Sequence, residues 1–199
     1  SNVTIQGYSF TTNVEVFENC GSFDLGLYHT SNNFAAPSFW LQKFYPESGN
    51  WGHPVTGVIY VDGTQLSAIN SINLTNNTIN FNLSYFGEFR IMKRYQVVSN
   101  GNTAQYCNEF LYEFEFTGLP RINTVYSFSC GNNLRDVIVD ASGVPPLLYR
   151  IIEKDGEPFL IENGNSTTFL SLETGIYTFQ IEDSCGNLRN SEFEISDSV

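Results

Sequence analysis

The chain has 199 residues and a formal net charge of −12, and it is 41% hydrophobic and 15% aromatic. This length suits one large domain or two small ones, and the apolar content indicates packed cores rather than a disordered chain. The acidity leaves no basic footprint for nucleic acid and disfavours anionic membranes, and no run reaches the roughly 18 apolar residues of a spanning helix.

Period-2 alternation of apolar and polar residues predicts strands, with almost no helix. Residues 12–17 alternate partway, and residues 110–116 and 176–181 separate into two faces. The predicted aromatic face of the middle segment is Phe110, Tyr112, Phe114 and Phe116. Because tight Asp-Gly and Asn-Gly turns recur between short strands, the sequence predicts an all-β sandwich or barrel.

The order of features after Cys20 recurs after Cys130, which indicates an internal duplication. The matched segments are Asp24–Leu27 with Asp136–Val139, Lys43 with Arg150, Gly49 with Gly156, Gly87–Ile91 with Gly175–Phe179, and Glu113–Phe116 with Glu192–Ile195. We therefore predict two tandem immunoglobulin-like β-sandwich domains, residues 1–119 and residues 120–199. The first copy is longer, chiefly between Gly49 and Gly87 and between Lys93 and Cys107, where we expect longer loops.

Four cysteines permit three pairings, and the repeat selects Cys20 with Cys107 and Cys130 with Cys185. One internal disulfide per domain implies an oxidising compartment outside the cytoplasm. A structural metal site would need clustered thiolates, and none occurs. No EF-hand loop, P-loop or dinucleotide fingerprint appears, so no cofactor is expected. A calcium site that uses Asp136 and Asp140 is left open.

The first copy carries the candidates for ligand binding. Trp51 lies in a turn-like stretch with His53, and Tyr45 precedes it, whereas Trp40 is expected in the core. His29 and His53 are both expected on exposed loops, and neither has an equivalent in the second copy. Because no nucleophile elbow accompanies them, the sequence does not predict an enzyme.

Several segments carry a resemblance to a known family. They are Phe39–Pro46 and Gly49–Pro54 in the first copy, and Leu148–Gly156, Gly175–Tyr177 and Glu182–Asn187 in the second. They resemble the immunoglobulin-like repeats of Bacteroidota cell-surface proteins of the Flavobacterium type, which the type IX secretion system exports and which include gliding-motility-associated adhesins.

The resemblance implies a non-catalytic adhesion or spacer module of a long secreted protein. Its partners would be the other domains of that protein and a glycan or protein at the cell exterior. Its location would be extracellular, on the cell surface, with attachment to the outer membrane through other parts of the parent protein. The alternative function is that of a carbohydrate-binding module of a secreted polysaccharide-degrading protein.

Overall fold

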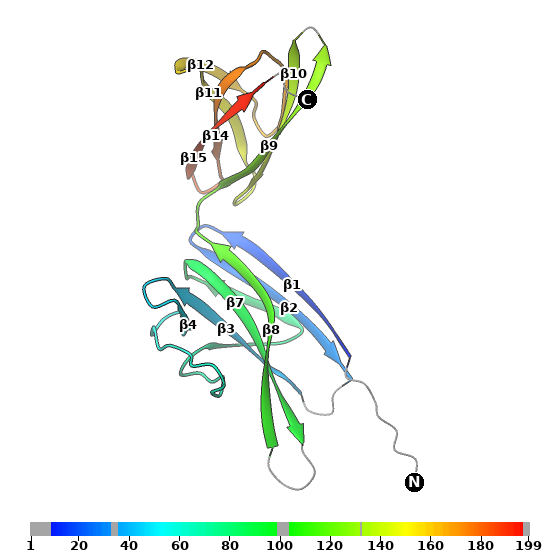
Figure 1. Cartoon of the computed structure of the whole chain (residues 1–199), viewed down its shortest axis with the longest axis vertical. Coiled ribbons are helices and arrows are strands. Elements are labelled where there is room, and N and C mark those ends of the chain that lie inside the picture. The colour runs from blue at the N-terminus through cyan, green and yellow to red at the C-terminus, as the bar shows by residue number, and fades with distance from the viewer. Residues whose placement is uncertain (1–8, 33–35, 99–103, 132, 197–199) are drawn as a thin grey trace. The chain divides into compact units, whose positions relative to one another are not determined.

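The computed structural model describes residues 9–32, 36–98, 104–131 and 133–196, and Figure 1 shows strands throughout. None of the described residues is helical, so the predicted all-β class is confirmed. The chain divides into two compact units, Ser1–Thr117 and Gly118–Val199. The first unit thus ends two residues (119 − 117) before the predicted domain end at residue 119.

Unit 1 is built from two antiparallel sheets. One sheet has the strand order β1-β2-β6, and the other has the order β4-β3-β7-β8, with β5 also paired to β3. The strands are β1 (Phe10–Asn19), β2 (Ser22–Ser31), β3 (Ser38–Tyr45), β4 (Asn50–Gly52), β5 (Ile72–Leu74), β6 (Thr78–Leu83), β7 (Gly87–Val98) and β8 (Ala104–Phe116).

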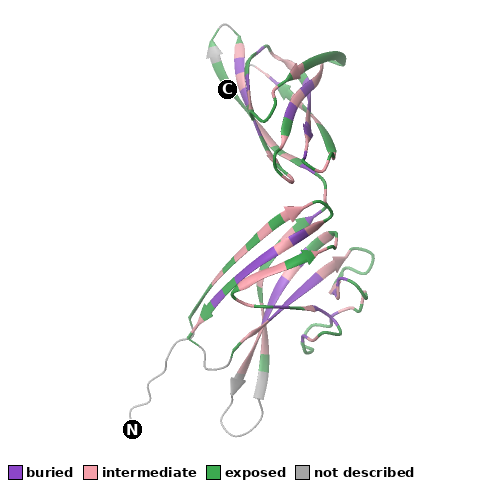
Figure 2. Ribbon diagram, turned by 180° about the vertical axis from the view of Figure 1, so that it is seen from behind, coloured by how far each residue is buried: buried purple, intermediate pink, exposed green. Residues whose placement is uncertain are grey.

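The core of unit 1 lies between these two sheets, where Figure 2 shows buried residues along the strands. Phe23 of β2 is fully buried, and its ring centroid lies 5.3 Å from that of Phe89 and 5.2 Å from those of Phe114 and Phe116. Such tilted and edge-on contacts add about 0.5–1.5 kcal/mol per pair to the burial of apolar area. The aromatic cluster therefore joins the two sheets into a sandwich.

Unit 2 has two sheets of the same kind. One has the strand order β13-β10-β9, and the other has the order β12-β11-β14-β15. The strands are β9 (Arg121–Gly131), β10 (Leu134–Ser142), β11 (Leu148–Lys154), β12 (Glu157–Glu162), β13 (Thr168–Leu172), β14 (Gly175–Glu182) and β15 (Leu188–Ile195).

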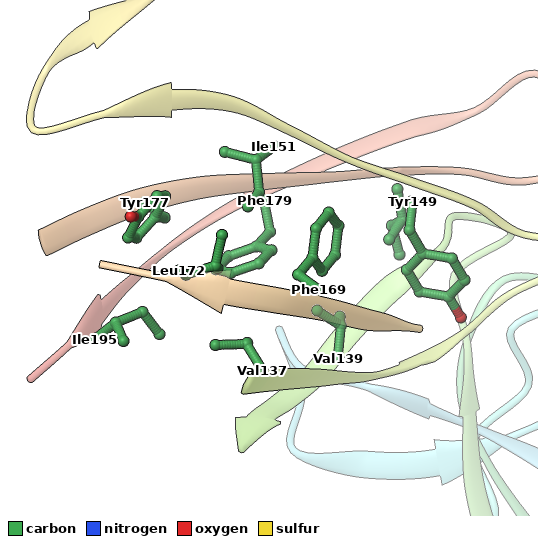
Figure 3. Packing of buried hydrophobic residues seen from close by; sticks show 10 residues of the cluster. Val137, Val139, Tyr149, Ile151, Phe169, Leu172, Tyr177, Phe179 and Ile195 are labelled. Carbon is green, nitrogen blue, oxygen red and sulfur yellow. The ribbon is translucent and has the colours of Figure 1, made fainter. Parts of the chain in front are cut away.

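Figure 3 shows the core of unit 2, to which both of its sheets contribute side chains. Val137 of β10 and Phe169 of β13 face Ile151 of β11 and Phe179 of β14. The rings of Phe169 and Phe179 meet edge-on with centroids 5.4 Å apart. Unit 2 is therefore also a sandwich with a core of its own.

Apart from β5, the strands of the two units follow each other in the same order within the two sheets. The register agrees with the internal alignment, because Gly87 pairs with Phe116 and Gly175 pairs with Ile195. Both glycines have positive φ, 125° and 153°. A duplication of one sandwich accounts for this correspondence.

The match between Lys43 and Arg150 is wrong. Lys43 pairs with the second residue after Gly87, whereas the second residue after Gly175 pairs with Lys154. Lys154 is therefore the structural equivalent of Lys43. The sequence match failed because the turn between the third and fourth strands is longer in unit 1, residues 46–49 against residues 155–156.

The predicted aromatic face of β8 is also wrong in part. Tyr112 pairs with Ile91 of the inner core, but Phe110 pairs with Met92, whose side chain lies on the opposite, outer face. Leu111 is an extra residue in β8, and such a β-bulge reverses the alternation of side chains. Phe110 is therefore exposed rather than part of the aromatic core.

The disulfide pairing differs from both predicted pairs. A disulfide joins Cys20 to Cys185, and Cys107 is a free thiol. The expectation of one internal disulfide in each domain is therefore wrong. The side chain of Cys130 lies outside the described residues.

The position of Cys107 in β8 explains why it cannot reach Cys20. Phe23, three residues after Cys20, packs against Phe116 at the end of β8. Cys107 precedes Phe116 by nine residues of the same strand, which is about 30 Å at ~3.3 Å per residue. A disulfide needs Cα atoms within about 7 Å of each other.

Candidate functional site

The additional residues of unit 1 form a loop, residues 53–71, that packs on the outer face of the sheet β4-β3-β7-β8. Tyr60 and Leu66 of this loop are buried against Trp40 of β3 and Met92 of β7. Trp40 is thus a core residue, as expected, but of this second, smaller core. The loop therefore has apolar anchors of its own.

The start of the loop is a tight hairpin that leads out of β4. The amide of Tyr60 donates to the carbonyl of Trp51 (2.7 Å), and the amide of His53 donates to that of Val58 (2.9 Å). A Cβ atom at Gly52 would lie 2.6 Å from the Val58 carbonyl oxygen. Only glycine permits this close approach, so the hairpin requires glycine at position 52, between Trp51 and His53.

A buried chain of polar side chains holds the end of the loop. Gln42 of β3 is fully buried and donates through Nε2 to the Ser71 hydroxyl (2.9 Å), which donates to Oδ1 of Asn70 (3.0 Å). Arg90 of β7 donates through Nε to Oε1 of Gln42 (2.8 Å). Satisfied networks of this kind fix one conformation, because each unpaired buried group would be costly.

A second set of hydrogen bonds ties the middle of the loop to β7 and β8. Nδ2 of Asn108 donates to the Tyr60 hydroxyl (2.9 Å) and to the Thr64 carbonyl (3.0 Å). Arg94 donates to the Leu66 carbonyl (3.2 Å). The loop is thus attached to β7 and β8 at Tyr60, Thr64 and Leu66, in addition to its end at Asn70 and Ser71.

Two of the predicted site residues lie together in this loop region. The Tyr45 hydroxyl donates to the His53 carbonyl (2.6 Å), and burial raises the pKa of Tyr45. Nδ1 of His53 accepts from the amides of Val55 (3.1 Å) and Thr56 (3.3 Å). These polar atoms therefore support the turn, and contact of Tyr45 and His53 with a ligand stays a prediction.

The third predicted residue, Trp51, lines a pocket of about 440 Å³ beside the hairpin. We call this pocket the cradle. Its lining includes Asn50, Trp51, Tyr60, Asp62 and Arg90. The sequence pointed to Trp51 but not to Arg90, which is far away in the chain. The sequence does indicate an arginine on the outer face of a period-2 strand. It does not indicate which part of the chain covers that face.

Arg90 is the centre of charge in the cradle. Its guanidinium carbon lies 4.7 Å from the ring centroid of Trp51 and 5.6 Å from that of Tyr60. Burial lowers the pKa of Arg90, and the nearby Asp62, Tyr60 and Glu113 oppose that shift. Because arginine stays protonated in proteins, the cradle holds a cation near two aromatic rings, with an acid nearby.

A second polar cluster lies inside unit 1, and sequence reasoning missed it. His29 is 3% exposed on β2 rather than on an exposed loop, and its Nδ1 lies 2.8 Å from the Thr12 hydroxyl. Fully buried Lys93 of β7 forms an ion pair with Glu109 (2.7 Å). Burial, followed by Lys93, lowers the pKa of His29, and Glu109 opposes the shift. An imidazole with a lowered pKa thus lies near an ion pair between buried Lys93 and partly exposed Glu109.

Within the described ranges, no three His, Cys, Asp or Glu side chains form a group that could hold a metal ion, and no helix there could cross a membrane. Asp136, one of the calcium candidates, accepts a hydrogen bond from the Ser171 amide (2.9 Å). Comparisons of the chain with family models, with curated proteins and with solved structures found no match.

Proposed function

We propose that this chain is a non-catalytic adhesion module of an exported surface protein, with two tandem immunoglobulin-like domains, and that the cradle of the first makes the contact. Two antiparallel sheets that share one core, repeated in a second unit, support the immunoglobulin-like assignment. The resemblance to type IX-exported adhesins supplies the setting of secretion or gliding motility.

One observation carries the proposal. In unit 2, residues 163–167 are enough to connect β12 to β13, whereas residues 53–77 connect the equivalent strands β4 and β6 of unit 1. The sandwich does not need the additional residues, yet they are fixed by a small core and a buried polar chain. Ordered loops on a rigid scaffold commonly carry recognition.

The cysteine chemistry and the charge fit an extracellular setting. A disulfide persists in oxidising compartments, and cytosolic thiols are kept reduced. The net charge of −12 keeps a displayed module soluble and unassociated. Attachment to a cell surface and the identity of the parent protein are parts of the proposal that rest on the resemblance.

The test measures binding of the fluorescently labelled chain to intact bacterial cells and to abiotic surfaces. We expect binding that is lost when residues 53–71 are replaced by a short turn like that of unit 2. Because this replacement exposes Trp40, a second variant that combines Trp51→Ala with Asp62→Ala keeps the loop. Binding that survives in both variants would exclude the cradle as the contact.

The non-enzyme part is tested separately on glycoside, ester and peptide substrates. We expect no turnover. Turnover that is abolished by His53→Ala would contradict the proposal and assign this chain a catalytic site.

A further inference from the structure

We infer that the cradle binds a neutral carbohydrate, whose vicinal hydroxyl groups bridge Arg90 and Asp62 while a face of the sugar packs on Trp51. The inference rests on the proposed function, because it names the class of ligand for the same contact surface.

The first argument is that two opposite charges line one pocket without forming an ion pair with each other. Arg90 uses Nε to donate to Gln42, and its terminal nitrogens have no hydrogen-bond partner among the described residues. The carboxylate of Asp62 likewise has neither an ion pair nor a hydrogen bond within the described part of the chain, and Asp62 is exposed. The cradle thus offers a free donor and a free acceptor across a space that a ligand can occupy.

The second argument concerns which groups can use both sides. A hydroxyl group both donates and accepts, so two neighbouring hydroxyls can accept from Arg90 and donate to Asp62 at once. Hydrogen bonds to charged partners are roughly twice as strong as neutral ones. A metal cation would be repelled by Arg90, and an anionic ligand would be repelled by Asp62 and by the net charge of −12. A neutral polyhydroxyl compound therefore fits best.

The third argument is the apolar wall. Two neighbours fix the Trp51 ring: the guanidinium carbon of Arg90 lies 4.7 Å from its centroid, and the ring centroid of Phe44 lies 5.2 Å from it. A ring that is already fixed costs little ordering on binding. The apolar C–H face of a pyranose suits such an aromatic surface. The volume of about 440 Å³ also falls in the range of small-ligand sites, about 300–1,000 Å³.

The experiment titrates the full chain with cello-, manno-, xylo- and malto-oligosaccharides, and with oligogalacturonate as the charged probe. Isothermal calorimetry gives the affinity, and tryptophan fluorescence reports contact near Trp51. We expect at least one neutral series to bind and oligogalacturonate not to bind. Trp51→Ala and Asp62→Asn should each weaken binding about tenfold or more, as expected for the loss of one good contact.

Two variants serve as matched controls. Phe110→Ala removes an exposed aromatic from the same outer sheet face, and Glu47→Gln removes a charge from the turn between β3 and β4, both outside the cradle lining. Neither should change the affinity. Asp62→Asn changes an exposed side chain and leaves the fold intact, so its effect reports contact rather than unfolding.

The outcomes separate this inference from the proposed function. Preference for oligogalacturonate, no binding of any neutral series, or binding that ignores Trp51→Ala and Asp62→Asn would overturn the inference. If cell binding still depended on the cradle, the contact would be with a protein or a charged glycan and the adhesion proposal would stand. Carbohydrate binding without any effect of the cradle on cell binding would support the inference and overturn adhesion.

Discussion

The two units have the same strand order but differ in what covers their sheets. Unit 2 connects β12 to β13 through residues 163–167, and its core is a single cluster. Unit 1 has a second core, outside the sheet, because Trp40 and Met92 face the loop and not the partner sheet. Unit 1 thus carries an ordered additional loop on a sheet whose strand order it shares with unit 2.

What the copies share is equally informative. Oδ1 of Asp24 accepts from the amide of Asn82 (2.8 Å), and Oδ1 of Asp136 accepts from the amide of Ser171 (2.9 Å). Asn82 and Ser171 both have positive φ, 56° and 55°, and the strand register shifts beside each aspartate. Both copies therefore use one aspartate to hold the same irregularity in the third strand of the smaller sheet.

The largest expected effect tests whether the two cores are separate. Phe89→Ala in unit 1 and Phe179→Ala in unit 2 each remove a ring that is at most 1% exposed, and each should cost about 3–5 kcal/mol of unfolding free energy. Both tryptophans belong to unit 1, so tryptophan fluorescence follows that unit alone, while circular dichroism follows both. Phe89→Ala should shift the fluorescence transition, and Phe179→Ala should not. Equal shifts would mean one cooperative unit.

The next prediction tests the shared aspartates. Asp24→Ala and Asp136→Ala each leave a strand amide without its carboxylate partner and should destabilise their own unit by about 1–3 kcal/mol. Chemical denaturation followed by tryptophan fluorescence reports unit 1 alone, and circular dichroism of the same samples adds the transition of unit 2. A large loss in one copy and none in the other would show that the two carboxylates are not equivalent.

The sequence was informative where the features are local. Alternation predicted the strands, and the match of Asp24–Leu27 with Asp136–Val139 pairs the two equivalent aspartates correctly. The match of Glu113–Phe116 with Glu192–Ile195 agrees with the strand register. Local patterns succeed because the side-chain period of a strand is fixed by backbone geometry.

The failures all involve changes in length or contacts between distant residues. The bulge at Leu111 moved Phe110 to the outer face, and the longer β7–β8 hairpin left Cys107 far from Cys20. Two copies of a repeat can have the same order of residues along the chain although equivalent residues lie at different distances from the ends of their strands. The contact of Trp51 with Arg90 depends on β3 pairing with both β4 and β7, which no local pattern encodes.

A smaller effect distinguishes the interiors of the two copies, because both histidines belong to unit 1. The pKa of His29 is lowered from 6.5, first by burial and then by Lys93, while Glu109 opposes the shift. Below pH 6.5 the unfolded chain therefore binds a proton that the folded chain does not, and the stability from the neutral imidazole is lost as pH falls.

His29→Phe removes this titration, and the new ring can meet Phe10 and Phe39, whose centroids lie 5.5 and 5.1 Å from that of the imidazole. The denaturation midpoint of unit 1 is measured by tryptophan fluorescence at about pH 7.5 and at about pH 5. Its decrease from the higher to the lower pH should be smaller in the variant than in the parent. An identical fall in both proteins would assign the pH dependence to other groups.

The smallest expected effect compares the two residues at positive φ. Ser171 has φ of 55°, a region that serine adopts at a cost, whereas asparagine at position 82 tolerates its φ of 56°. Ser171→Gly relieves the contact of Cβ with the backbone but adds freedom to the unfolded chain, so the net gain should be about 0.5–1 kcal/mol. Asn82→Gly should change the unfolding free energy by only a few tenths of a kcal/mol, since there is less strain to relieve. Both hydrogen bonds to the aspartates use backbone amides, so neither substitution removes them.

Denaturant titrations of the two variants against the parent chain measure the difference. A loss of stability in Ser171→Gly would mean that the serine side chain contributes more than its backbone strain costs, and the two irregularities would then be held in different ways.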